Sequence, residues 1–175
     1  MSTATVVRAS EHLGQEFEEI FREHHQLIYR TAYSVTGNRQ DAEDVLQTIF
    51  VRLLKRELPP DLWNNPKAYL YRAAVNVSLS VLRTRSRQRL AGDVEDLEIP
   101  TETSDSGPDD EIQRNLIDAM AQLSPQAVEM LILRYEHNYS DAEIAKMLGK
   151  SRGTVAVTLY RARARLKKLL KRKQP

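Results

Sequence analysis

The stretch SDAEIAKMLGKSRGTVAVTLYRARARLKKLLKRK, residues 140–173, decides the fold of the C-terminal part of the chain. Ser140, followed three residues later by Glu143, predicts a capping box at the start of a short helix. Gly149 can take the left-handed conformation of a tight turn, and Ser151 is a good N-cap for a second helix. A helix, a glycine turn and an amphipathic helix predict a helix-turn-helix, because apolar residues of the second helix recur at steps of four and three: Val155, Leu159, Ala162, Leu166 and Leu169.

The charge of this hairpin has one sign. Between Ile144 and Pro175 there are eleven Lys and Arg residues and no acidic residue. In a helix-turn-helix the second helix enters the major groove, its first turn faces base edges, and its basic residues contact phosphate. The sequence therefore predicts nucleic-acid binding; the alternative is a helical hairpin with a solvated basic face.

Apolar residues recur at helical spacing along most of the chain, and strand-like alternation is nearly absent, so the expected fold is all-α. One helix is expected to end at Gly37, a second before Pro59, and a third to run from Pro66 towards Arg89. Residues 91–111 contain nine acidic residues and no basic one, which predicts a flexible acidic linker. We expect two small helical domains, at 10–90 and 112–173, joined by the linker at 91–111.

The composition excludes several functional classes. The chain has 175 residues, a formal net charge of +2 and no cysteine, so disulfides, thiolate metal sites and a cysteine nucleophile are excluded. Its four histidines lack metal-ligand spacing, and there is no phosphate-binding glycine loop. No apolar run approaches the roughly 18 residues of a membrane span. We expect a cytoplasmic protein that is not an enzyme, needs no cofactor or metal, and does not insert into a membrane.

Two segments of the N-terminal half resemble a known family. GNRQDAEDVLQTIFVRLLKR (37–56) and WNNPKAYLYRAAVNVSLSVLRTRSR (63–87) are similar to the second conserved region of the extracytoplasmic-function (ECF) sigma factors of bacterial RNA polymerase, within the sigma-70 family. YSDAEIAKMLGKSRGTVAVTLYRARARLK (139–167) resembles their fourth region. This chain differs at Ala156, Val157 and Thr158, where relatives tend to carry Lys, Ser and Arg.

The resemblance implies that the first domain would bind the β′ clamp helices of core RNA polymerase and the −10 promoter element, and the second the β flap and the −35 element. The residues that it implies for core binding are Asp41, Glu43, Asp44, Gln47, Phe50 and Leu53. Those for the −10 element are Trp63, Asn64, Asn65, Tyr69, Tyr71, Arg72, Asn76 and Arg83. Those for the −35 element are Ser151, Arg152, Thr154, Ala156, Tyr160 and Arg161.

Each assignment has a structural alternative. The acids at the start of the second helix also favour its dipole, Trp63 and Tyr69 could fill the core, and Asn65 could serve only as a cap. Asn76, inside a helix, is either a structural bridge or a DNA contact. The acidic linker either enters the polymerase cleft or is a soluble tether. For the whole chain, the alternative is a helix-turn-helix regulator that does not dock on core polymerase. An anti-sigma factor that clamps both domains is common in the family, and the sequence neither requires nor excludes one.

Overall fold

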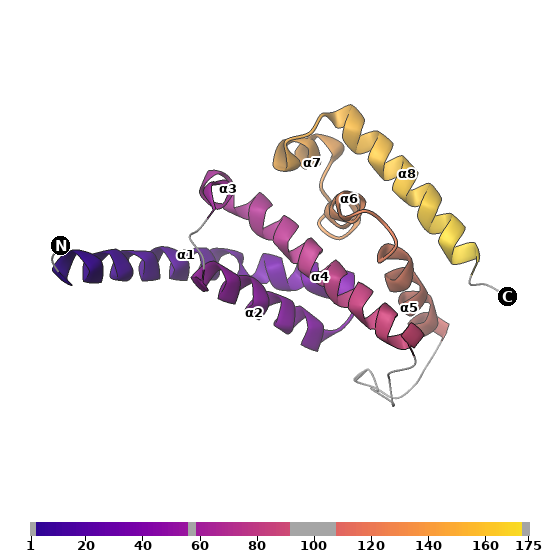
Figure 1. The fold of residues 1–175 in the computed structure, drawn as a ribbon. Helices are drawn as coiled ribbons and strands as arrows, with labels where there is room; N and C mark the ends of the chain where they lie inside the picture. Colours follow the sequence, from indigo (N-terminus) through magenta and orange to yellow (C-terminus); the bar gives the residue numbers. More distant parts are fainter. Residues whose placement is uncertain (1–2, 56–58, 92–107, 173–175) are drawn as a thin grey trace.

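The structure, a computed structural model, describes residues 3–55, 59–91 and 108–172. Within these ranges the chain forms helices and no strand, as the periodicity predicts (Figure 1). The helices are α1 (Thr3–Thr36), α2 (Arg39–Lys55), α3 (Pro60–Asn64), α4 (Pro66–Ala91), α5 (Pro108–Met120), α6 (Pro125–Tyr135), α7 (Asp141–Leu148) and α8 (Arg152–Lys171). Most of the expected linker, residues 92–107, lies outside the described residues. The expected domain boundaries stay predictions.

Local signals set the helix boundaries. α1 ends at Thr36 because Gly37 takes a φ of +74°, and the Gly37 N–H donates to the Tyr33 carbonyl at 2.8 Å. The α6 cap is Ser124, whose side chain accepts from the Ala127 N–H, with Pro125 at the first helical position. The predicted ends of these helices are therefore confirmed. The short helix α3 between Pro60 and Asn64 was not predicted.

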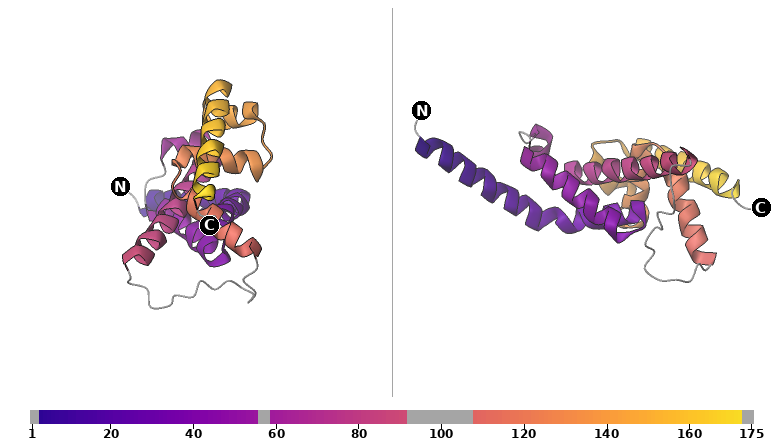
Figure 2. Two further views of the ribbon diagram at one scale, coloured as in Figure 1. Left: turned by 90° about the vertical axis from the view of Figure 1, so that its right-hand side faces the viewer. Right: turned by 60° about the horizontal axis from the view of Figure 1, so that its bottom comes forward.

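Helices α1–α4 form the N-terminal domain and helices α5–α8 the C-terminal domain (Figure 1). α4 lies against α1 and α2 on one side, and its Leu70 and Ala74 join their core. Phe50 of α2 packs edge-on against Phe17 and Phe21 of α1, with ring centroids 5.5 and 4.7 Å apart. The N-terminal domain is thus a helical bundle with its own apolar core. α1 extends past the other helices at its N-terminal end (Figures 1 and 2).

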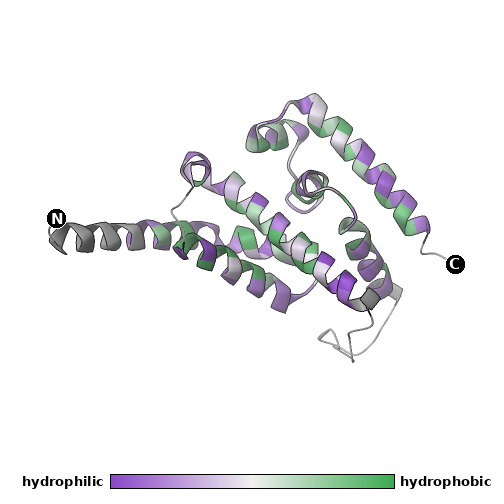
Figure 3. Ribbon diagram, viewed as in Figure 1, coloured by the Kyte–Doolittle hydropathy of each residue, from purple (hydrophilic) through white to green (hydrophobic). Residues whose placement is uncertain are grey.

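A second apolar core joins the two domains. Val35 of α1 and a row on α4 pack into one cluster with buried residues of α5, α6, α7 and α8. The α4 row is Tyr71, Val75, Leu79 and Leu82, so it follows helical spacing on a face about 100° round the helix from Leu70 and Ala74. α4 therefore buries one face in each core, which explains why its hydropathy is mixed around the helix (Figure 3). α8 lies on the outer edge of the molecule, away from α1 and α2 (Figure 1).

Candidate nucleic-acid interface

The α7–α8 hairpin has the local geometry that its sequence predicts. The Ser140 N–H donates to Glu143 Oε2 at 2.8 Å, and the Glu143 N–H donates to Ser140 Oγ at 3.3 Å. These bonds to Ser140 hold the pKa of the exposed Glu143 carboxyl below its ordinary value. Gly149 ends α7 in the left-handed conformation, with φ +63° and ψ +42°. The hairpin is therefore a helix-turn-helix whose turn is fixed by capping and by glycine.

α8 begins at a capped end and buries one stripe. The Thr154 N–H donates to Ser151 Oγ at 3.1 Å, and the two hydroxyls lie 2.9 Å apart. Val155, Leu159 and Ala162 are buried against the rest of the domain. The opposite side of the helix is left in solvent, and purple and green alternate along α8 in Figure 3.

The six residues predicted for the −35 element, Ser151, Arg152, Thr154, Ala156, Tyr160 and Arg161, are all exposed. Arg152, Ala156 and Tyr160 follow one another at four-residue steps, so they lie along one face of α8. Arg163 donates to the Tyr135 hydroxyl at 3.3 Å and is thereby turned towards α6. The charged residues on this exposed surface of α8 are all basic. The surface can therefore bind an anionic ligand, and the helix can lie in a groove of that ligand.

The six residues predicted for core binding fall into an exposed group and a buried group on α2. Glu43, Asp44 and Gln47 are exposed, whereas Asp41, Phe50 and Leu53 are buried, the last two at 5% and 7% exposure in the N-terminal core. The exposed face continues instead through Val51 and Leu54, which are 44% and 64% exposed. Residues 43, 47, 51 and 54 lie on one side of the helix. We call Glu43, Asp44, Gln47, Val51 and Leu54 the α2 outer face. Its last two members continue the helical spacing in steps of four and three, and they were not among the residues predicted for core binding.

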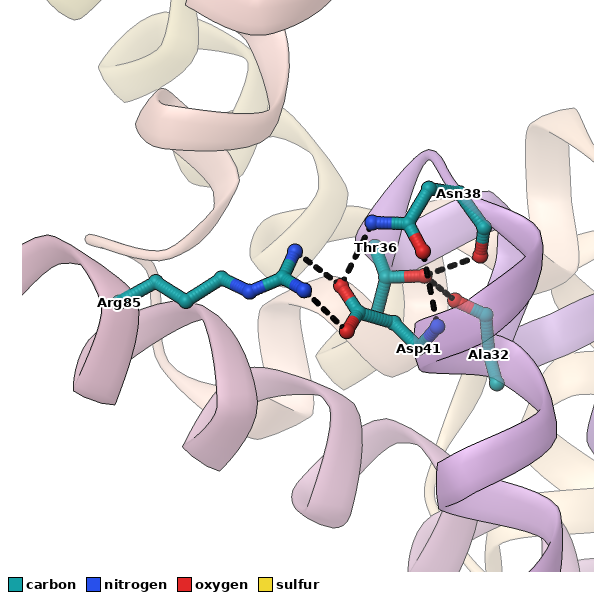
Figure 4. Close-up of polar contacts among 5 residues, drawn as sticks. All are labelled: Ala32, Thr36, Asn38, Asp41 and Arg85. Carbon is teal, nitrogen blue, oxygen red and sulfur yellow. Dashed lines mark hydrogen bonds and ion pairs between the residues drawn. The ribbon is translucent and has the colours of Figure 1, made fainter. Parts of the chain in front are cut away.

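Asp41 points away from this face into a structural network (Figure 4). Arg85 of α4 pairs with both of its carboxylate oxygens, and Asn38 Nδ2 donates to Asp41 Oδ2 at 2.8 Å. Asn38 also caps α2, because its Oδ1 accepts from the Asp41 N–H at 2.8 Å. Burial raises the pKa of the Asp41 carboxyl above its ordinary value, against the lowering effect of Arg85 and Asn38. Asp41 thus connects α2 to α4 and is 4% exposed.

The loop side of the predicted −10 surface is open to solvent. Trp63, at the end of α3, is 47% exposed, and Asn64 beside it is exposed as well. Asn65 is exposed and acts as a cap, because its Oδ1 accepts from the Ala68 N–H at 3.1 Å. Tyr69 is partly buried against the N-terminal core. An aromatic ring and an amide therefore remain accessible at this end of α4.

The α4 side of the predicted −10 surface contacts the C-terminal domain. The Tyr71 hydroxyl donates to the Glu129 carbonyl at 2.6 Å, and Arg72 Nη2 donates to the Leu148 carbonyl at 2.7 Å. Arg83 donates to the carbonyls of Ala121, at 3.2 Å, and Leu123, at 3.0 Å. Tyr71 is fully buried, and this burial raises the pKa of its hydroxyl. We call these bonds from Tyr71, Arg72 and Arg83 the interdomain contact.

Asn76 stands apart from the interdomain contact. Its Nδ2 donates to the Arg72 carbonyl one turn earlier, at 2.9 Å, and the side chain is exposed. It also lines a shallow groove between α2 and α4 of about 430 Å³. The residue therefore keeps its carbonyl oxygen available to a ligand while its amide bonds its own helix.

Two residues near the interdomain contact were missed. Lys67 Nζ donates to the Tyr139 hydroxyl at 2.6 Å and lies 5.3 Å from the centre of that ring. His137 lies with Nε2 3.4 Å from Thr31 Oγ1 and packs edge-on against Tyr71. No local signal marks these pairs, because they join residues far apart in the sequence.

Within the described residues, no group of three or more His, Cys, Asp or Glu side chains could hold a metal ion. None of the described helices combines the length and apolar character that a membrane crossing requires.

Two family models match the chain. One, described as Sigma-70 region 2, matches residues 20–88, and the other, described as Sigma-70, region 4, matches residues 113–166. The first covers α4 and the α2 outer face, and the second covers the helix-turn-helix. Each of the three predicted site groups therefore lies inside one of the matched regions.

Individual proteins agree with the family models. The RNA polymerase sigma-E factor of Streptomyces antibioticus is 33% identical over 167 residues, which cover 89% of this chain and 84% of that protein. The ECF RNA polymerase sigma factor SigE of Mycolicibacterium smegmatis is 30% identical over 162 residues, covering 88% of this chain and 61% of that longer protein. The sigma factor RpoE from Bartonella quintana, solved in complex with the anti-sigma factor NepR, has a TM-score of 0.50 and 24% identity over 91% of this chain and 99% of its own.

At that identity the solved structure shows likeness of fold alone. The two regions occur in the order that the sequence predicts, and relatives at 33% and 30% identity are matched along most of this chain. The chain therefore belongs to the extracytoplasmic-function class of the sigma-70 family, whose members direct RNA polymerase to promoters and so initiate transcription.

Proposed function

We propose that the chain divides the work of promoter recognition among three surfaces. The α2 outer face would dock on the β′ clamp helices of core RNA polymerase, and α3 with α4 would hold and open the −10 element. The exposed surface of α8 would bind the −35 element, with the C-terminal domain resting on the β flap. The chain would supply no catalytic group and no cofactor, because polymerase performs the chemistry. Its place of action would be the cytoplasm, where core polymerase is.

The observation that carries this proposal is the exposed face of α8. Arg152, Thr154 and Ala156 lie in its first two turns, after a capped N-terminus, and they are exposed. Arg161, Arg163 and Arg165 follow, and the α8 sequence contains no acidic residue. Backbone N–H groups, hydroxyls and a guanidinium at the start of a helix suit base edges and phosphates.

The α2 outer face supports docking on polymerase for a different reason. It places Glu43, Asp44 and Gln47 next to two exposed aliphatic side chains, Val51 and Leu54. Charged residues at the edge of an apolar patch provide orientation, while the apolar part provides affinity. Phe50 and Leu53, being buried, would support this face from below rather than touch the partner.

Opening of the −10 element would use stacking and charge. Trp63 offers an accessible ring, Asn64 offers an amide, and Asn65 and Tyr69 lie beside them. Arg72 and Arg83 on α4 would hold the backbone of the strand, and Tyr71 and Asn76 of the same helix would complete this side of the surface. Single-stranded DNA is bound by this combination of aromatic rings and cations.

An anti-sigma partner is proposed from the likeness to RpoE, which was solved with its anti-sigma factor NepR. Such a partner would cover the α2 outer face. The charge-reversal variant described next should therefore also lose binding of the anti-sigma factor.

The proposal is tested by association with core polymerase. The double variant Asp44→Arg with Leu54→Ala should lose affinity about thirtyfold or more, as expected where a charge and an apolar contact fall at the centre of an interface. The matched control, Glu111→Arg with Ile112→Ala, changes an exposed acid and an apolar residue of 63% exposure on α5. Both proteins should remain helical by circular dichroism. Equal affinity of the two variants for core polymerase would contradict docking on the α2 outer face.

A further inference from the structure

The middle of the exposed face of α8 carries small and apolar residues, although the helix is basic. At about 100° per residue, Val157 lies about 140° to 160° round the helix axis from each residue of the buried stripe, so it is on the side away from the domain. Its side chain is 48% exposed. Gly153, Tyr160 and Ala164 continue this line at steps of four and three, and all are exposed. We call Gly153, Val157, Tyr160 and Ala164 the α8 centre line.

Basic residues lie on both sides of the α8 centre line. By the same angle count, Arg161 and Arg165 lie on one side of Val157, and Arg163 and Lys167 lie on the other; all four are exposed. The major groove is about 12 Å wide, and a helix with its side chains is about 10–12 Å across. The flanks of an inserted helix therefore meet the phosphate-lined walls, while its central face meets base edges. The charges of α8 suit this arrangement, and they place the centre line over the bases.

Gly153 allows the start of the centre line to approach a ligand closely. Glycine within a helix is less favourable than alanine, so its presence in the first turn needs a reason. Its φ is not positive, so the backbone conformation does not require it. Apart from its chain neighbours and the backbone of its own helix, a Cβ at this position would meet only Ser151 Oγ, at 3.8 Å, which is ordinary van der Waals contact. Packing does not require glycine either. The missing side chain lets the helix backbone, and Val157 one turn later, come near a surface.

The first two turns of the centre line have no side-chain hydrogen-bond donor or acceptor, because Gly153 and Val157 offer none. A base edge can be read there only by apolar contact, and the C5-methyl group of thymine is the apolar group that base edges present in the major groove. We propose that Val157 is a specificity-determining residue that packs on a thymine methyl group of the −35 element. This inference rests on the proposed function, because it takes the seating of α8 on the −35 element from there.

The experiment uses holoenzyme assembled from core RNA polymerase and the full chain. Promoter fragments with a randomised −35 region are selected by binding, and the selected element is rebuilt as a defined duplex. Each thymine of the element, on either strand, is then replaced in turn by deoxyuridine, which forms the same base pair and lacks only the C5-methyl group. Affinities are compared by fluorescence anisotropy at one fixed salt concentration.

We expect the selection to enrich thymine at one or more positions of the element. Deoxyuridine at one or two of these positions should weaken binding of the parent about fourfold, the equivalent of about 0.8 kcal/mol for one buried carbon. Deoxyuridine in the spacer between the two promoter elements should leave the affinity unchanged.

Val157→Ser removes both methyl groups of the side chain, and serine has nearly the same helix propensity as valine. This variant should bind the thymine element about fourfold more weakly, since one carbon-to-carbon contact is lost. It should no longer distinguish thymine from deoxyuridine at the sensitive position. The matched control is Ile112→Ser, which replaces a branched apolar residue of 63% exposure on α5. The control should distinguish the two bases as the parent does.

Gly153→Ala tests the close approach with two measurements of opposite sign. Alanine favours the helix, so the urea midpoint of unfolding should rise. The added methyl group holds the helix away from the bases, so binding of the selected element should weaken and the sensitivity to deoxyuridine should decrease. A glycine that served only the fold would not give this combination. Binding as tight as that of the parent would exclude the close approach.

Two further results would overturn the assignment to Val157. One is a parent that binds every deoxyuridine duplex as tightly as the thymine duplex. The other is a Val157→Ser variant that keeps the discrimination of the parent. Thr154→Ser removes a neighbouring methyl group and keeps the hydroxyl that lies 2.9 Å from Ser151 Oγ. Loss of discrimination in Thr154→Ser but not in Val157→Ser would therefore assign the methyl contact to Thr154 and refute the proposal.

Failure of the proposed function gives a different result. If the selection yields no sequence preference in the −35 region, or if scrambling the selected element leaves the affinity of the holoenzyme unchanged, α8 does not read a −35 element. A clear −35 preference that is indifferent to the C5-methyl groups would instead leave that role in place and remove only the contact of Val157 with thymine.

Discussion

The arginines of α4 and those of α8 differ in what surrounds them. On α4 the partly buried Arg72 and the exposed Arg83 both donate to main-chain carbonyls of the other domain, whereas Arg152 and Arg161 lie on the exposed face of α8. Both helices are basic, and both belong to regions that sigma factors use for promoters. The comparison teaches that residue type alone does not say whether a DNA-binding surface is free. In this chain all six residues proposed for the −35 element are exposed, whereas three of the eight proposed for the −10 element, Tyr69, Tyr71 and Arg72, are buried or partly buried.

The largest expected effect is a loss of stability, and it should differ between substitutions on the α4 surface and on the α8 surface. Tyr71→Ala would leave a cavity in the shared core and remove the hydrogen bond from its hydroxyl to the Glu129 carbonyl, so the free energy of unfolding should fall by about 3–5 kcal/mol. Tyr160→Ala removes a ring that is 69% exposed and should change it by less than about 0.5 kcal/mol. Urea denaturation followed by circular dichroism compares the two. Similar losses would mean that the α4 surface is no more engaged than the α8 surface.

The next effect concerns readout of the −35 element. Arg152→Ala should relax the preference of the holoenzyme at one or two −35 positions, by about 1–3 kcal/mol, because a guanidinium at the first turn can pair with a guanine edge. Arg161→Ala should weaken all −35 variants alike and lower the salt slope by about one. Salt-titrated anisotropy on a panel of −35 variants measures both. If Arg152→Ala lost the same affinity for every −35 variant, Arg152 would be a phosphate contact and not a base contact.

A smaller effect tests the cap that starts the α8 surface. Ser151→Ala removes the acceptor for the Thr154 N–H and should lower the free energy of unfolding by about 1 kcal/mol. The distance between the domains should stay as in the parent, because α8 does not bond α4 through this residue. The control is Ser34→Ala, whose hydroxyl donates to the Arg30 carbonyl within a helix and is not a cap. A loss in the control as large as in Ser151→Ala would contradict the capping role.

The smallest expected effect is a dependence on pH of the closed arrangement, in which the interdomain contact joins the two domains. Burial, and then the nearby Arg30, lower the pKa of His137 below its ordinary value of 6.5, while Glu136 raises it and Lys67 lowers it. A group with a lowered pKa stays neutral in the closed form and takes up a proton when the domains separate. Closure is therefore at full strength above about pH 6.5 and weakens as the pH falls below that value.

Other titratable groups lie near the interdomain contact, and the experiment must distinguish them from His137. Glu129 of α6 has its pKa raised by burial, so its protonation in acid would favour closure and oppose the effect of His137. Energy transfer between dyes on Glu19→Cys and Lys146→Cys, at exposed positions of α1 and α7, reports the distance between the domains. Measured between pH 8 and pH 5.5, it should fall in the parent and stay flatter in His137→Gln. His25→Gln changes a histidine of α1 that bonds carbonyls of its own helix, and it should behave as the parent. A fall of equal size in His137→Gln would exclude His137 as its source.

The sequence predicts what depends on neighbours in the chain. Ser124, Ser140, Gly149 and Ser151 act within three or four residues, so composition and spacing suffice to identify helix ends and the helix-turn-helix. The family resemblance likewise rests on contiguous stretches, residues 37–56, 63–87 and 139–167. These predictions are confirmed by the helix boundaries and by the two family matches.

The sequence does not predict the direction in which each side chain of an amphipathic helix points into tertiary structure. Asp41 and Asp44 are the same residue type, three positions apart. Asp41 is nonetheless buried, because it pairs with Arg85, 44 residues later in the chain. Phe50 and Leu53 sit beside the acids in sequence and yet face α1 and α4. The bonds of Tyr71, Arg72 and Arg83 depend on a domain that begins after the linker, so no local pattern could reveal them.

The interdomain contact draws only main-chain oxygen atoms from the C-terminal domain. The carbonyls of Ala121, Leu123 and Leu148 stay in place whatever side chain they carry, so the hydrogen bonds themselves do not restrict residue type at these positions. The side chains of Leu123 and Leu148 are restricted instead by their burial in the shared core. The arginines of α4 are restricted by the hydrogen bonds themselves, because the interdomain contact and the proposed −10 strand both need their guanidinium groups. Evolution could therefore exchange the bases that α8 reads, and so reassign the chain to new genes, without rebuilding the contact that closes it.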